Sequence, residues 1–200
     1  MRKDVKNSLR SLVVAVLAAL TVSSQAAIAV YETFMDGPSE APPNASPGTG
    51  WSVLTFDTTA MTMRLEASFT GLTGTTTAAH IHAPTAVAGV GTASVATQVP
   101  SFVGFPLGVT SGVYDNTFDM TLTTSYNGSF ITNNGGTTTA AFAALMSYVD
   151  AGRAYLNIHS STFGGGEIRG FYAPVPEPMT LAVIGLGAAA LVRKRARRRA

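Results

Sequence analysis

Cysteine is absent from all 200 residues of the chain. No disulfide framework, thiolate metal site or cysteine nucleophile can therefore form, while export remains compatible with the composition. Lysine is missing between residues 30 and 175, where three arginines stand against nine carboxylates and give a formal charge of −6. Such a surface repels a phosphate backbone, so the composition argues against nucleic-acid binding.

Signatures of common enzyme classes are also missing. There is no Gly-x-Ser-x-Gly nucleophile turn, and Gly89-Val90-Gly91 lacks the rest of a dinucleotide fingerprint. Glu40 and Glu167 are the carboxylates that could be nominated for glycoside hydrolysis, but nothing in their spacing supports that chemistry. The sequence predicts a protein without enzymatic activity.

The first 29 residues have the three parts of a signal peptide. A basic stretch, 1–10, precedes an apolar run, 11–22, that is too short for a comfortable membrane span, and small residues follow. We expect signal peptidase to cut between Ala26 and Ala29, with an uncleaved anchor as the alternative. The small residues at −3 and −1 would be Ser24 with Ala26, or Ala27 with Ala29.

Residues 173–200 form a second addressing segment. Pro176-Glu177-Pro178 precedes an apolar run, 179–192, and an arginine-rich end. As a helix rising ~1.5 Å per residue, this run is shorter than a ~30 Å hydrocarbon core, and its basic end stays on the cytoplasmic side. The segment resembles the PEP-CTERM sorting signal of Gram-negative bacteria. That resemblance implies transient inner-membrane anchoring, cutting by an exosortase, and release to the periplasm, cell surface or extracellular polysaccharide matrix; the alternative is a plain membrane anchor.

The stretch between these ends, residues 30–172, is rich in residues that favour strands and turns. In 61–69, Met61, Met63, Leu65, Ala67 and Phe69 alternate with polar residues, which predicts a strand with one buried face. One helix is expected over 139–149, ended by Gly152. Regular strands and turns predict a mainly β fold, an antiparallel sandwich or barrel-like domain with one short helix. The other expected strands lie at 51–56, 79–83, within 112–123 (where Phe118, Met120 and Leu122 alternate), at 154–159 and at 167–172.

The three histidines of the chain lie in two matching contexts. His80 and His82 are two residues apart on one strand face, and His159 shares a face with Asn157 and Tyr155. Three imidazoles from two strands could hold copper or zinc. The alternative is a structural polar network in which the rings bond to backbone carbonyls and nearby Asn or Glu.

Two further polar motifs have structural and functional interpretations. Glu167 and Arg169 alternate on a strand, so they could pair with each other or across the sheet within a structural network that includes Asn157. The functional alternative is that Arg169 binds a carboxylate or a sugar acid. Glu40-Ala41-Pro42-Pro43 is expected to be a stiff, extended loop, or else a plain edge connection.

Together these motifs resemble the CHRD domain, a module named for chordin, over about residues 30–172. Departures from the family pattern are small. Phe171 follows Arg169-Gly170 where the family often has glutamine, and the loop over residues 84–112 is particular to this chain. The resemblance implies an extracellular, β-rich domain without an established reaction. The motifs that carry it are Gly37-Pro38-Ser39-Glu40-Ala41-Pro42-Pro43, Gly71-Leu72, Ala79-His80-Ile81-His82, Gly152, Tyr155-Leu156-Asn157-Ile158-His159 and Gly166-Glu167-Ile168-Arg169-Gly170.

Two hypotheses for function follow. The first is a non-enzymatic envelope or matrix domain that binds a protein, a polysaccharide or copies of itself. The second is a metalloprotein in which His80, His82 and His159 hold copper or zinc, with redox activity as one option. Locally it is similar to copper–zinc superoxide dismutase, but it lacks that enzyme's disulfide cysteines and has too few histidines for a two-metal site.

Overall fold

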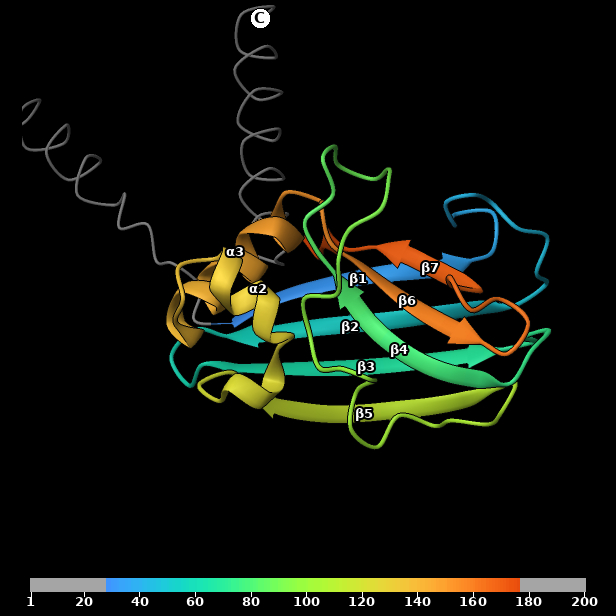
Figure 1. Ribbon diagram of the computed structural model, residues 1–200, viewed down its shortest axis with the longest axis horizontal. Helices are drawn as coiled ribbons and strands as arrows, with labels where there is room; N and C mark the ends of the chain where they lie inside the picture. The colour runs from blue at the N-terminus through green and yellow to red at the C-terminus, as the bar shows by residue number, and fades with distance from the viewer. Residues whose placement is uncertain (1–27, 177–200) are drawn as a thin grey trace, which may run out of the picture.

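One curled antiparallel sheet dominates the computed structural model, which describes residues 28–176. The strand order is β4-β6-β7-β1-β2-β3-β5, and the short β8 also pairs with β1. Three helical segments lie between β5 and β6 and gather near one end of the sheet (Figure 1). The elements are β1 Ile28–Asp36, β2 Thr49–Asp57, β3 Thr62–Thr70, β4 Thr76–His82, β5 Gly112–Asp119, η1 Thr123–Ser125, α2 Gly128–Asn133, α3 Thr138–Asp150, β6 Tyr155–Ser160, β7 Ile168–Phe171 and β8 Ala173–Pro174.

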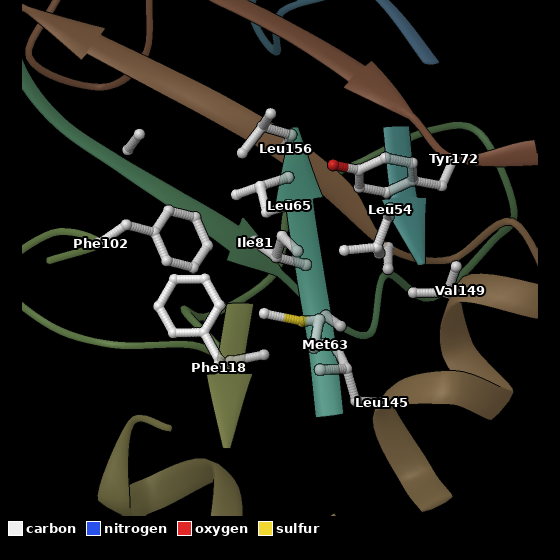
Figure 2. Packing of buried hydrophobic residues seen from close by; sticks show 14 of the residues in the cluster. Leu54, Met63, Leu65, Ile81, Phe102, Phe118, Leu145, Val149, Leu156 and Tyr172 are labelled. Atoms are coloured by element: carbon white, nitrogen blue, oxygen red, sulfur yellow. The ribbon is translucent and has the colours of Figure 1, made fainter. Parts of the chain in front are cut away.

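The hydrophobic core lies inside the curl of this sheet. Leu54 of β2 and Leu65 of β3 meet Ile81 of β4 and Leu156 of β6, and all four side chains are fully buried (Figure 2). Successive side chains of a strand point to opposite faces of the sheet, so every second residue of these strands faces the core. The result is a half-barrel in which β4 and β6 pack over β2 and β3.

Aromatic side chains fill the open side and one end of the half-barrel. Phe102, from the long segment between β4 and β5, packs its ring 5.3 Å from that of Phe118 and donates its backbone N–H to Ala79 O. At the end of the sheet, Phe142 of α3 lies edge-on to Phe56 at 5.7 Å. The segment between β4 and β5 therefore contributes Phe102 to the core.

The expected mainly β, antiparallel architecture is confirmed. The helix expected over 139–149 is α3, where Thr137 caps the N-terminus by accepting from Ala140 N and Gly152 follows the helix with a φ of +65°. In β3, Met63, Leu65, Ala67 and Phe69 are buried as their alternation predicts, and Met61 is partly buried. Strand β1 and the short helix α2 were not predicted from the sequence.

The expected alternation through Leu122 is wrong. Phe118 and Met120 are buried, but Leu122 is 51% exposed because β5 ends at Asp119. The carboxylate of Asp119 accepts hydrogen bonds from the backbone N–H and the hydroxyl of Thr121, which turns the chain away from the sheet.

The loop around Glu40 also differs from its prediction. It is folded rather than extended, because the backbone N–H groups of Glu40 and Asn44 both donate to Gly37 O. The turn carries Glu40 inward, where its side chain is buried. This loop is therefore neither a stiff extended segment nor a plain edge connection.

Most of both terminal segments lies outside the described residues. The signal peptide falls there except for Ile28 and Ala29, and so do Glu177, Pro178 and the apolar run 179–192. Within residues 28–176 the helices are all too short or too polar to cross a bilayer.

The contact between β7 and β1 leaves no room for a side chain at Gly170. A Cβ atom there would overlap Phe34 O and Thr33 Oγ1. We therefore expect Gly170→Ala to lower the free energy of unfolding by about 1–3 kcal/mol or more, measured by urea denaturation. Gly128→Ala is the matched control, because a Cβ at Gly128 meets nothing within 4 Å. Equal stability of the two variants would contradict this close approach.

Candidate metal centre

The pairing of β4 with β6 brings the three histidines together on the sheet face opposite the core. His80 stands opposite Asn157, His82 opposite Tyr155, and Ala78 opposite His159. His80 and His159 are thus diagonal neighbours, close enough for imidazole rings to touch. The ring centroids of the three histidines are 5.2–5.8 Å apart. The prediction that His80 and His82 share one face, and His159 lies beside them, agrees with this geometry.

Each ring has one nitrogen bonded to a backbone carbonyl. His80 Nε2 lies 2.7 Å from Pro100 O, His82 Nδ1 lies 2.8 Å from Ala93 O, and His159 Nδ1 lies 3.0 Å from Gly164 O. A carbonyl oxygen only accepts, so each of these nitrogens carries the proton. The carbonyls therefore set the tautomer of every ring, as the outer shell of a metal site does.

The remaining nitrogen of each ring faces the other two rings and has a free lone pair. His80 Nδ1 lies 3.3 Å from His159 Nε2, and one ligand atom from each residue falls within 4.8 Å of the others. His82 Nε2 is buried with no hydrogen-bond partner among the described residues. Three acceptors thus converge, and no donor in residues 28–176 is aimed between them.

Burial keeps the imidazoles neutral. It lowers the pKa of His82 to about 4, against the raising effect of the Ala93 carbonyl, and the other histidines and Arg169 lower this pKa further. Burial also lowers the pKa values of His80 and His159, although their carbonyl partners act in the opposite direction. At neutral pH all three rings are in the form that can bind a metal.

The three nitrogens fit a copper or zinc ion. Two nitrogens bound to one such ion at about 2.1 Å stand roughly 3.4 Å apart in tetrahedral geometry. The His80–His159 pair, at 3.3 Å, already has that spacing. A pair at the 4.8 Å limit would have to close by about 1.4 Å to reach this spacing. Neutral imidazole is a ligand that both metals accept.

Tyr155 supports the centre from the next position in the sheet. Its ring stacks on His82 with the centroids 5.0 Å apart and the planes 5° from parallel. Ala93 bonds to both residues, since its carbonyl accepts from His82 and its N–H donates to the Tyr155 hydroxyl. Arg169 lies over the Tyr155 ring, with its guanidinium carbon 4.8 Å from the ring centroid.

Arg169 holds loops to the sheet. It is 3% exposed, donates to Ser39 O and Gly91 O, and lies 3.8 Å from the carboxylate of Glu40. This enclosure supports the structural interpretation of Arg169 and leaves little access for an outside carboxylate or sugar acid. Asn157, its neighbour in β6, is also buried, and its Oδ1 has no partner among the described residues.

Glu167 belongs to a separate set of contacts. Its carboxylate accepts from the Ser46 hydroxyl at 2.6 Å and from the backbone N–H groups of Thr73 and Gly74. Burial raises the pKa of Glu167, but these donors, together with Ser160, outweigh burial and leave the pKa lowered. Within residues 28–176 no ion pair joins Glu167 to Arg169, so of the two arrangements left open by the sequence the direct pairing does not occur.

The groups that orient the histidines were not predicted from the sequence. The carbonyls of Ala93, Pro100 and Gly164 belong to the backbone, so residue type carries no signal for them. Glu40 was not matched to Arg169, because 129 residues separate them and only the folded loop joins them. The available signal was the position of Arg169 in a strand, since an arginine that becomes buried there requires a carboxylate partner.

A pH titration tests the environment of Glu40. Burial raises its pKa from 4.5 to about 7, although Arg169 acts in the opposite direction. The unfolded chain therefore releases this proton near pH 4.5 and the folded chain near pH 7, so the contribution of Glu40 to stability falls as pH rises between these values. We expect Glu40→Gln to gain stability relative to the unmodified chain over this window, measured by urea unfolding. Parallel curves for the two chains would contradict the raised pKa.

Comparison with known proteins agrees with the features described above. The family model described as the CHRD domain matches residues 31–172, which includes all three histidines and both buried charges of the β7 segment. Comparisons with curated proteins and with solved structures give no match. The matched segment spans more than half of the chain and coincides with the half-barrel. The chain therefore belongs to the CHRD domain family, whose members occur in extracellular or secreted proteins.

Proposed function

We propose that this CHRD domain is an exported, non-enzymatic binding domain that holds one copper or zinc ion on His80, His82 and His159. The observation that carries the proposal is the convergence of three acceptor nitrogens with no donor between them. A purely structural network would pair each inner nitrogen with a donor. Here the inner nitrogens of His80 and His159 meet only each other, and His82 Nε2 has no partner among the described residues. This is the arrangement expected when a cation completes the site.

The ligand set is sufficient to hold one ion through three protein nitrogens. Three neutral imidazoles leave a fourth position open on the metal, and a bound copper ion would add one-electron chemistry that zinc lacks. Within residues 28–176 no hydroxyl group bonds to any of these rings, so none is placed as a nucleophile that a histidine activates. The role assigned to the residues of this chain is to hold and orient the ion.

Export follows from the terminal segments. Signal peptidase would remove the first segment, and an exosortase would act at Pro176-Glu177-Pro178 after the tail has paused in the inner membrane of a Gram-negative cell. Membership of a family found in secreted proteins supports this route. The domain would then reach the periplasm, the outer surface or the extracellular matrix.

The structure favours one of the two cleavage positions. Ile28 pairs with Asp57 and Ala29 with Phe56 at the start of β1. Cleavage after Ala29 would remove both pairs, whereas cleavage after Ala26 keeps the strand whole. The mature chain would therefore begin at Ala27.

A second candidate function is a matrix domain that acts through its surface and needs no metal. It is favoured by large apolar side chains left exposed on the sheet, among them Phe34 at 54% and Trp51 at 43%. Partners on this view are an extracellular polysaccharide or protein. The two functions are compatible, because the surface and the histidines lie on different strands.

Metal analysis tests the centre. We expect the purified chain to carry about one copper or zinc ion, and His82→Ala or His159→Ala to lose it. A metal-free chain should gain about 2.7 kcal/mol of unfolding free energy when the metal is present at 100 times its dissociation constant. Both quantities are accessible by mass spectrometry of the metal and by urea denaturation.

A remote polar substitution controls for damage to the fold. Asn116→Ala, on β5, should keep the metal and the stabilisation. Nitrogen NMR of the metal-free chain should place the protons on His80 Nε2, His82 Nδ1 and His159 Nδ1. A folded chain that binds neither metal and gains no stability from either would refute the metal centre.

Cell fractionation and intact mass test the export route. We expect an N-terminus at Ala27 and a C-terminus near Pro176-Glu177-Pro178, with the domain outside the cytoplasm. Replacing Pro176, Glu177 and Pro178 by alanine should leave the chain longer and held in the membrane. Unchanged mass and unchanged location in that variant would exclude exosortase sorting.

A further inference from the structure

A row of apolar side chains crosses the outer face of the sheet away from the histidines. The register places Phe34 of β1 opposite Trp51 of β2, Trp51 opposite Ser68 of β3, and Ser68 opposite Val113 of β5. These four positions, of which Phe34 and Trp51 are aromatic, are here called the aromatic row. Phe34 is 54% exposed, Trp51 43% and Val113 80%. Large apolar groups thus lie in water on a face where alternation would permit polar residues.

An acidic row runs beside the aromatic row. One alternation further along the same strands, Glu32 lies opposite Val53, Val53 opposite Glu66, and Glu66 opposite Asp115. Arg64 bonds to Asp115 at 2.6 Å and to Glu66 at 3.0 Å, so it neutralises only part of this charge. Aromatic rings and carboxylates therefore share one surface.

Three shallow hollows meet at Trp51. Their volumes are about 550, 300 and 400 Å³, and Trp51 lines all of them. Ser39, Thr49, Ser68 and Thr70 add hydroxyl groups to their walls. Among the described residues, no arginine or lysine lines any of the three. The surface is a shallow groove with flat rings in its floor and hydrogen-bond acceptors along its sides.

We propose that this groove binds a polysaccharide that contains amino sugars. The apolar faces of sugar rings would stack on Trp51 and Phe34, their hydroxyls would bond to the serine and threonine side chains, and their ammonium groups would meet Glu32, Glu66 and Asp115. The inference deepens the proposed extracellular binding role and does not depend on the metal centre.

Other occupants fit the groove less well. An extended peptide gains affinity from a free strand edge, whereas β1, β2 and β3, which carry both rings, are paired on both sides. Of the strands that form the groove, only β5, at one border, has a free edge. A second copy of the chain carries the same −6 charge between residues 30 and 175, and an anionic membrane or a uronic-acid polymer would also be repelled. Charge complementarity therefore selects a cationic, ring-rich ligand.

Trp51 is the single tryptophan of the chain, so its fluorescence reports directly on this groove. We expect a glucosamine oligomer to change the emission of the purified full chain, and the fully N-acetylated oligomer to bind about tenfold more weakly because its charge is lost. In calorimetry, Trp51→Ala and Phe34→Ala should each weaken binding about tenfold. Leu122→Ala is the control, since Leu122 is exposed at 51% and lies outside the groove.

The outcomes separate this proposal from the others. Failure of both oligomers to bind, or binding that Trp51→Ala leaves unchanged, would overturn it. It would also be overturned if oligolysine or anionic vesicles bound as strongly as the glucosamine oligomer in a Trp51-dependent way. Self-association of the chain that depends on Trp51 and is equally strong would overturn it too. The metal content of Trp51→Ala should stay as in the unmodified chain, so loss of metal in the histidine variants and loss of sugar binding are read independently.

Discussion

The antiparallel register between β4 and β6 is the constraint on which the chemistry of this domain depends. It places Ile81, Leu156 and Ile158 in the core and, on the opposite face, brings His80 and His82 beside His159. Because side chains alternate with a period of two, a slip of one residue would exchange these faces. Burial of the aliphatic side chains thus holds the three imidazoles in place.

The buried charges connect the histidines to the loops that orient them. Arg169 bonds to the backbone at Ser39 and Gly91, and Glu167 bonds to the backbone at Thr73 and Gly74. Breaking one partner of such a buried group is strongly destabilising, so these contacts keep the loops in one arrangement. Gly91 lies two residues before Ala93, whose carbonyl sets the tautomer of His82. Arg169 and the histidine centre are therefore connected through the segment from Gly91 to Ala93.

The two halves of the sheet present different chemistry on their outer faces. Loops cover the half formed by β4, β6 and β7, which encloses neutral imidazoles. The half formed by β1, β2, β3 and β5 is open and carries the aromatic and acidic rows. An enclosed histidine cluster and an exposed apolar surface therefore coexist in one half-barrel of the CHRD family.

Local signals in the sequence were sufficient to predict the class of fold, most strands, helix α3, the family and the candidate ligands His80, His82 and His159. These signals are alternation, turn residues, capping and short motifs. Contacts between distant segments fix three further features: a single sheet curls, the loop at Glu40 folds inward to Arg169, and the carbonyls of Ala93, Pro100 and Gly164 set the imidazole tautomers. The tertiary structure also decided that Phe34 and Trp51 stand side by side. Each of these features depends on contacts between segments that are distant in the sequence. Where the contact is made by a backbone group, the type of residue does not indicate it.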